Sequence, residues 1–254
     1  MQRDIDKFSE YCNLKELFVN IEKCHAIMFS RKNNPPHFNV DLFLNNVNLS
    51  YVSTVRDLGV TLDAKLLFET HIELIVQRAL RSLGFVLRVT SGFKNSASLI
   101  NLYNSVVRPI LEFSTVVWSP MYKKYLDRIE SVQRKFVNML DFRFNRRRHY
   151  MPYNENVSFY NLQTLESRRK CFDIIFIYKI VNNLIDSEYC TNYLSYNANH
   201  YTLHNRQIFN IKICHSNYVL NSPLIRWAQA VNCMPQLDVN LDLFSTSFKR
   251  FKGL

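Results

Sequence analysis

The side chains that could do chemistry in this sequence are mainly cations placed next to aromatic rings. The densest run is Arg-Phe-Asn-Arg-Arg-Arg-His-Tyr at 143–150. Guanidinium groups bind phosphates and aromatic rings stack on bases, so this combination suits nucleic acid. A solvated loop or a localisation-like basic patch would have the same composition, and the run alone leaves both interpretations open. It supplies four candidate nucleic-acid-binding residues: Arg143, Arg146, Arg147 and Arg148.

Two predicted helices carry further cations. Apolar residues recur at helical spacing over 70–89 and 122–140, which predicts an amphipathic helix in each. On the first, Arg78, Arg81 and Arg88 fall opposite the apolar arc, where a row of arginines could follow a phosphate backbone. A solvated helix face explains the same row. On the second helix the candidates opposite the apolar face are Lys124, Arg128, Arg134 and Lys135.

The sequence lacks the residue patterns of metal sites, phosphate-binding loops and serine hydrolases. The six cysteines form no C-x-x-C, and adjacent Cys-His pairs are not spaced as zinc ligands, so no metal site is predicted. Four glycines in 254 residues make a phosphate-binding loop improbable, and no serine-hydrolase pattern or adjacent Asp-Asp occurs. Free thiols suit a reducing compartment, which predicts an intracellular protein, nuclear or cytoplasmic.

The net charge of +11 is concentrated in one part of the chain. Residues 65–150 hold 15 Lys or Arg and 6 Asp or Glu, a net charge of +9, whereas 1–64 carry −1 and 151–254 carry +3. This distribution makes the middle segment the expected polyanion-binding part. There is no run of about 18 apolar residues, so no membrane span is predicted. No small-molecule substrate is expected.

Shorter elements must position these cations. A helix is predicted over 2–18, followed by two short strands at 25–30 and 38–44 on either side of a proline pair. Around Asp57-Leu58-Gly59-Val60 we expect a strand that crosses Gly59, where the glycine marks either a close backbone approach or a bulge.

The remaining predicted helices span 96–113 and 161–185. Pro109 should end or kink the first, and Glu112 should pair with Arg108 in a buried structural contact rather than act in catalysis. The second is apolar nearly all round, so we expect it to be buried. Residues 186–254 are expected to form loops with short strands or turns.

Several strings together resemble reverse transcriptases of non-LTR retrotransposons of the jockey or LINE type. The segment around Lys23 resembles motif D of that family, and the Asp-Leu-Gly-Val-Thr-Leu-Asp string resembles motif E, the primer grip. Further along, the chain resembles the family's thumb and the region after it. The strings are 20–29, 57–63, 102–120 and 162–169.

The resemblance implies roles for two residues. Lys23 becomes a candidate general acid for the pyrophosphate leaving group, although a solvated turn lysine is the interpretation favoured without the rest of the active site. Gly59 would lie against the primer strand. The family's Mg²⁺-binding carboxylates precede motif D. About twenty residues precede Lys23 here, so we expect an inactive fragment without a cofactor, Mg²⁺ being needed only by a full-length polymerase.

We therefore predict an α+β fold, mainly α, in three parts. A palm remnant with a small antiparallel sheet occupies 1–63, a basic thumb-like helical domain 64–150, and a helical or irregular region 151–254. The predicted function is that of a polymerase fragment that keeps RNA or DNA template–primer binding. The alternatives are a domesticated protein-interaction module and a decayed transposon reading frame. The oligomeric state is left open.

Overall fold

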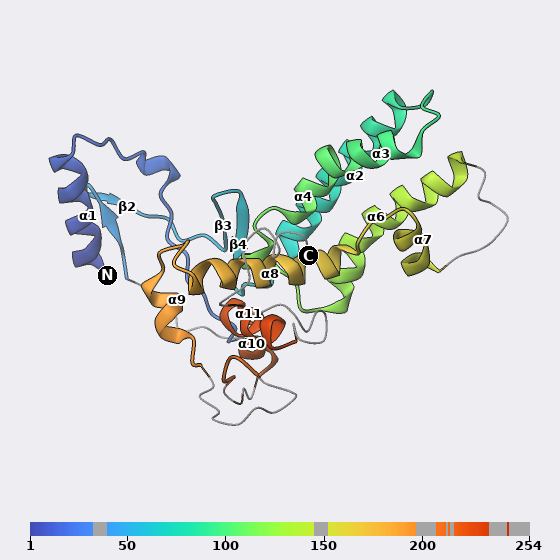
Figure 1. The fold of residues 1–254 in the computed structure, drawn as a ribbon. Coiled ribbons are helices and arrows are strands. Elements are labelled where there is room, and N and C mark those ends of the chain that lie inside the picture. Colours follow the sequence, from blue (N-terminus) through green and yellow to red (C-terminus); the bar gives the residue numbers. More distant parts are fainter. Residues whose placement is uncertain are drawn as a thin grey trace. The chain divides into compact units, whose positions relative to one another are not determined.

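The computed structural model of the chain describes residues 1–32, 40–144, 152–196, 207–211, 213, 216–233 and 243 (Figure 1). The chain divides into two compact units, Met1–Leu74 and Ile75–Leu254. The described residues form short antiparallel hairpins in the first unit and helices in the second, so the predicted α+β, mainly α class is confirmed. The sequence-based boundaries at 63 and 150 stay predictions.

The first unit begins with a helix tied to a hairpin. Helix α1 (Gln2–Leu14) is joined to strand β1 (Phe43–Leu44) by the Gln2 amide, which donates to the Phe43 carbonyl at 2.8 Å and accepts its N–H at 2.9 Å. Strand β1 pairs with β2 (Val47–Asn48) across Asn45 and Asn46, whose φ values are 49° and 64°. Two successive left-handed residues are what a tight type I′ hairpin requires, and asparagine tolerates them.

The second hairpin corrects the prediction for Gly59. Strands β3 (Thr54–Asp57) and β4 (Val60–Asp63) pair antiparallel, and the glycine lies between them rather than inside a strand. Leu58 and Gly59 have φ values of 43° and 89°, so the glycine occupies the turn position that most needs positive φ. The prediction was wrong because the apolar residues on both sides of the glycine suggested one continuous strand.

The predicted strand at 25–30 is also wrong. This segment contributes a parallel bridge of Ala26 to Tyr51, after a 3₁₀ turn, η1 (Ile21–Lys23). Part of the predicted strand at 38–44, together with the proline pair, falls outside the described residues, and its end forms β1. The Asp63 carboxylate then accepts the backbone N–H groups of Lys65, Leu67 and Phe68 at 2.6–3.1 Å. This arrangement fixes the loop that leads into helix α2.

Helix α2 (Glu69–Val89) confirms the predicted helix and begins one residue earlier. Its buried face holds Ile72, Val76, Ala79, Leu83 and Val86, which recur at intervals of three and four residues. The Asn95 side chain caps α3 (Ser96–Leu102) by accepting the N–H of Ala97 at 2.9 Å.

The next segment changes helix type. A π-helical turn, η2 (Tyr103–Val107), leads into α4 (Arg108–Glu112), where Pro109 lies in the first turn. Proline lacks the N–H that would continue the α-helical pattern, and a widened turn accommodates it. The expected kink is therefore realised as a change of helix type just before the proline.

Where the structure describes the second unit, the chain continues with helices, apart from an isolated Tyr196–Phe209 bridge. The predicted helix 122–140 is α6, and the predicted buried helix 161–185 is α8, which packs on α11 (Figure 1). A buried cluster around them includes Ile174, Ile177, Phe209, Trp227 and Val231. The remaining bounds are α5 (Thr115–Trp118), α6 (Lys123–Arg143), α7 (Tyr153–Phe159), α8 (Leu165–Val181), α9 (Glu188–Tyr193), α10 (Asn217–Leu220) and α11 (Pro223–Asn232).

A search of the described residues for membrane-spanning helices finds none of sufficient length and apolar character. The same part of the chain contains no group of three or more His, Cys, Asp or Glu side chains that could hold a metal ion.

Candidate nucleic-acid interface and the neighbouring polar network

The arginines of α2 form one exposed row. Arg78, Arg81 and Arg88 are exposed, and none of them forms a hydrogen bond or ion pair with another described residue. Phe85 lies between Arg81 and Arg88 and is exposed as well, with 58% of its surface accessible. Spacings of three, four and three residues place these four side chains along one ridge, about 15 Å long at 1.5 Å per residue. We call them the α2 stripe.

The sequence produces the α2 stripe because the opposite side of the helix is occupied by the core. Val76, Ala79, Leu83 and Val86 are almost fully buried, so the arginines must face solvent. Three guanidinium groups with free donors are suited to an extended run of phosphates.

The cations predicted on α6 are less uniform. Lys124, Arg134 and Lys135 are exposed, whereas Arg128 is half-buried. The Lys124 ammonium lies 5.1 Å from the centre of the Tyr125 ring, and the Arg134 guanidinium lies 4.9 Å from that of Tyr153. Arg134 therefore packs on α7 as well as facing solvent.

Arg143 has a structural contact that the sequence did not reveal. Its guanidinium donates to the carbonyls of Leu87 and Thr90, and to the Thr90 hydroxyl at 3.2 Å. These acceptors lie at the C-terminal end of α2, where a positive charge is favourable. Both terminal nitrogens are thus engaged, and phosphate binding by Arg143 stays a prediction.

The other predicted site residues are separate from these helices in sequence. Lys23 is exposed at the end of η1, and Gly59 is exposed in the β3–β4 turn. The roles suggested for them stay predictions. Arg146, Arg147 and Arg148 lie outside the described residues.

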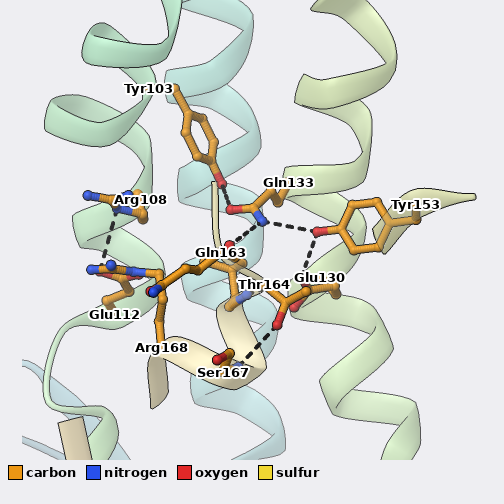
Figure 2. A network of polar contacts seen from close by, with 11 residues as sticks. Tyr103, Arg108, Glu112, Glu130, Gln133, Tyr153, Gln163, Thr164, Ser167 and Arg168 are labelled. Atoms are coloured by element: carbon orange, nitrogen blue, oxygen red, sulfur yellow. Dashed lines mark hydrogen bonds and ion pairs between the residues drawn. The ribbon is translucent and has the colours of Figure 1, made fainter. Parts of the chain in front are cut away.

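Beside the exposed cations, the second unit contains a buried polar network centred on Gln133 (Figure 2). Its amide accepts from the Tyr103 hydroxyl at 3.1 Å and donates to the Tyr153 hydroxyl at 3.1 Å and the Gln163 carbonyl at 2.9 Å. Gln133 is fully buried, so this one side chain joins α6 to η2, to α7 and to the loop that precedes α8.

Glu130 extends the network toward α8. Its carboxylate accepts from the Tyr153 hydroxyl at 2.5 Å and from the backbone N–H of Leu165 at 3.1 Å. Burial raises the pKa of Tyr153, and the hydrogen bond to Glu130 raises it further. Burial is also the main cause of the raised pKa of Tyr103. Both phenols therefore stay protonated and act as hydrogen-bond donors.

The predicted ion pair between Glu112 and Arg108 is present at 3.7 Å, but Arg108 is not the main partner of Glu112. The main partner is Arg168 on α8, which binds both carboxylate oxygens (Figure 2). In the sequence, Arg168 is one of two adjacent arginines near the start of a predicted helix, and nothing else singled it out. Its partner is 56 residues away, and nothing local indicates it.

A second buried ion pair joins α8 to α11. Arg226 donates to both Asp173 oxygens at 2.8 and 3.2 Å, and to the Val116 carbonyl at 2.6 Å. Burial raises the pKa of Asp173, while Arg226 opposes that shift. The network and the two ion pairs join parts of the second unit to one another, whereas the guanidinium groups of the α2 stripe have no such contacts among the described residues.

Two curated proteins are similar to part of the chain. Over 138 residues, it is 29% identical to the RNA-directed DNA polymerase from mobile element jockey of Drosophila melanogaster, covering 53% of this chain and 15% of that protein. It is also 28% identical over 138 residues to an uncharacterized protein of Caenorhabditis elegans, covering 53% and 65% respectively. No protein-family profile and no solved structure matches the chain.

These matches span less than two thirds of the length of either relative. The similarity to the jockey polymerase supports a relation to reverse transcriptases.

Proposed function

We propose that this chain is part of a reverse transcriptase of a non-LTR mobile element and that it binds a template–primer duplex through the α2 stripe. The observation that carries the proposal is the set of three exposed arginines on one ridge, without partners among the described residues. The partial similarity to the jockey polymerase supports the same class of ligand.

The dimensions of the stripe suit a duplex. Each strand carries a negative charge about every 3.4 Å, so a ridge of about 15 Å passes some four phosphates. Exposed guanidinium groups can meet such a strand without breaking an internal ion pair. Lys124, Arg128, Arg134 and Lys135 on α6 are proposed as additional contacts, with Arg146, Arg147 and Arg148.

The proposal assigns no polymerisation chemistry to these 254 residues. The sequence contains no adjacent aspartates, and two palm-type carboxylates would be needed to hold two Mg²⁺ ions. In this proposal residues 1–63 correspond to the end of a palm and 64–150 to a thumb. Lys23 is the proposed remnant of the general acid, and Gly59 is proposed to approach the primer.

The test measures the affinity for a 20-base-pair RNA–DNA hybrid by fluorescence anisotropy between 50 and 200 mM salt. The variant Arg78→Ala/Arg81→Ala/Arg88→Ala should reduce the slope of log affinity against log salt by about 2.7, since each phosphate contact contributes about 0.9. A matched control, Arg3→Ala/Lys7→Ala/Lys15→Ala, removes three exposed charges from the first unit. It should change the slope much less.

Equal slopes for the wild type and the α2 variant would contradict the proposal. Equal reductions in the two variants would show that net charge, rather than the α2 stripe, controls binding. If the wild type bound no nucleic acid at low salt, the alternative of a protein-interaction module would be favoured.

A further inference from the structure

Helix α2 contains a glycine, Gly84, in its interior. Glycine is among the least favourable residues there, because its backbone has the most freedom to lose. Apart from its chain neighbours and the backbone of its own helix, a Cβ atom added to Gly84 would meet no atom of the described residues within 4 Å. Close packing within this part of the chain therefore does not explain why a glycine stands at this position.

Gly84 borders the α2 stripe at its exposed phenylalanine. Residues three and four positions apart are neighbours on a helix surface, so Gly84 and Phe85 both adjoin Arg81 on one side and Arg88 on the other. The two arginines are about 10.5 Å apart along the helix axis. Phe85 is 58% exposed, and Gly84 is partly exposed. A ring and a position without a side chain thus lie side by side between two cations.

The charge of this surface is of one sign. The sequence contains no Asp or Glu from 74 to 111, so no carboxylate of this segment competes for the arginines. The α2 stripe therefore suits a polyanion, and the contribution of Phe85 decides which kind of polyanion fits best.

A continuous duplex makes poor use of Phe85. The bases of a duplex are stacked inside it, so a duplex backbone that follows the ridge would place charged phosphates against the ring. An unpaired strand instead offers open base faces, on which aromatic side chains stack with little dependence on sequence. A single exposed phenylalanine is ordinary on a protein surface. At Phe85, however, the ring lies between two cations and beside an open backbone position.

Building on the proposed function, we propose that the α2 stripe binds the unpaired template strand where that strand leaves the template–primer duplex. One unpaired base stacks on Phe85, and the sugar–phosphate backbone passes closely over Gly84. Arg81 and Arg88 donate to the phosphates on either side of that base. The preferred ligand is thus a junction between a duplex and a single strand.

The test compares two 20-base-pair RNA–DNA hybrids by fluorescence anisotropy at one salt concentration. The template of the first extends beyond the duplex by four unpaired adenosines. The template of the second extends by four abasic nucleotides, which carry the same phosphates without bases. The wild type should bind the first at least about fivefold more tightly, because base stacking on an aromatic ring contributes at least this factor. Equal affinities would overturn the inference.

Replacement of the ring tests the stacking directly. Phe85→Leu keeps an apolar side chain, so it should abolish the preference for the adenosine extension and leave the affinity for the abasic probe within about twofold. Phe8→Leu, at a ring of the first unit that is 51% exposed, is the matched control and should keep the preference. A preference retained by Phe85→Leu would overturn the stacking role. Equal losses for both probes would also overturn it, since they indicate a wedge in the duplex.

Gly84→Ala separates the ligand from the fold. Alanine favours a helix and meets no described atom here, so the variant should raise the midpoint of thermal unfolding. The added methyl group should nevertheless weaken binding of the adenosine probe at least about threefold, because it keeps the strand away from the helix. A higher midpoint with unchanged affinity would overturn the close approach over Gly84.

The same experiments distinguish this inference from the proposed function. If the wild type binds both probes equally, but the triple arginine variant of α2 still reduces the salt slope, the proposed function stands and the inference fails. If the wild type binds neither probe at low salt, both are contradicted.

Discussion

Helices α2 and α8 both carry arginines but place them in opposite environments. On α2 the apolar residues keep to one side, so Arg78, Arg81 and Arg88 remain in water, and they have no partners in the part of the chain that the structure describes. Helix α8 is mainly apolar only over its second half, 174–181, and in its first half Arg168 is half-buried and Arg169 is buried. Arg168 is then matched by Glu112 and Asp173 by Arg226. Whether an arginine is free to bind a ligand therefore depends on how the apolar residues are distributed around its helix.

The largest effect should come from breaking a buried pair on α8. Asp173→Asn would leave the guanidinium of Arg226 buried without its counter-charge, and removing one partner of such a pair typically costs about 3–5 kcal/mol. Urea denaturation of the two proteins measures the difference. Asp127→Asn, at an exposed carboxylate of α6, is the control and should change the free energy of unfolding by less than about 0.5 kcal/mol. A similar small change for Asp173→Asn would break the contrast between the two helices.

His71 is a buried base, and it avoids the cost of a buried charge by being neutral in the folded protein. Burial, helped by Arg56, lowers the pKa of His71 to about 4, so the ring is neutral at pH 7 and its Nδ1 accepts the N–H of Thr61 at 3.2 Å. The unfolded chain takes up the proton near pH 6.5 and the folded chain near pH 4. Stability should therefore fall as the pH drops through this window, by up to about 3 kcal/mol.

Thermal denaturation of the wild type and His71→Gln between pH 7 and pH 4 measures this contribution. The glutamine oxygen can accept the same N–H but does not titrate, so the variant should lose less stability on acidification. Parallel pH profiles for the two proteins would show that His71 does not titrate differently on folding.

The smallest effect on stability should come from the α2 stripe. Arg81→Ala removes an exposed side chain, so the free energy of unfolding should change by less than about 0.5 kcal/mol. Its proposed role predicts instead that the salt slope of hybrid binding falls by about 0.9. Denaturation and anisotropy on one preparation separate the two effects. A large loss of stability with unchanged binding would reverse the comparison.

The helices were predictable because each is specified by its own residues. The apolar spacing over 70–89 and 122–140 defines one buried face in each helix, and the structure has α2 and α6 there. The apolar residues of 174–181 correctly indicated burial of this part of α8. The exposed side of α2 followed from the same periodicity.

The polar network was not predictable from the sequence because its partners are far apart in the chain. Gln133 bonds residues 20 and 30 positions away, and Arg226 binds a carboxylate 53 positions away. Gln133 looks like any polar residue of a helix until Tyr103 of η2 and Tyr153 of α7 pack around it. The turn at Gly59 was missed for a local reason. It depends on the positive φ angles of Leu58 and Gly59, whereas the residues on both sides are typical of a strand.

The π-helical turn at Tyr103–Val107 has a consequence for how this region can vary among relatives. Along 99–111 the fully buried residues recur every fourth position: Leu99, Tyr103, Val107 and Leu111. An ordinary α-helix would drift away from one face at that spacing, and the wider turn takes up the difference. Loss of one residue within the turn would change the spacing to four, three and four residues, which a regular α-helix keeps on one face, so Glu112 would still face Arg168. Relatives that lack one residue here should therefore keep the acidic residue at 112 and the basic residue at 168.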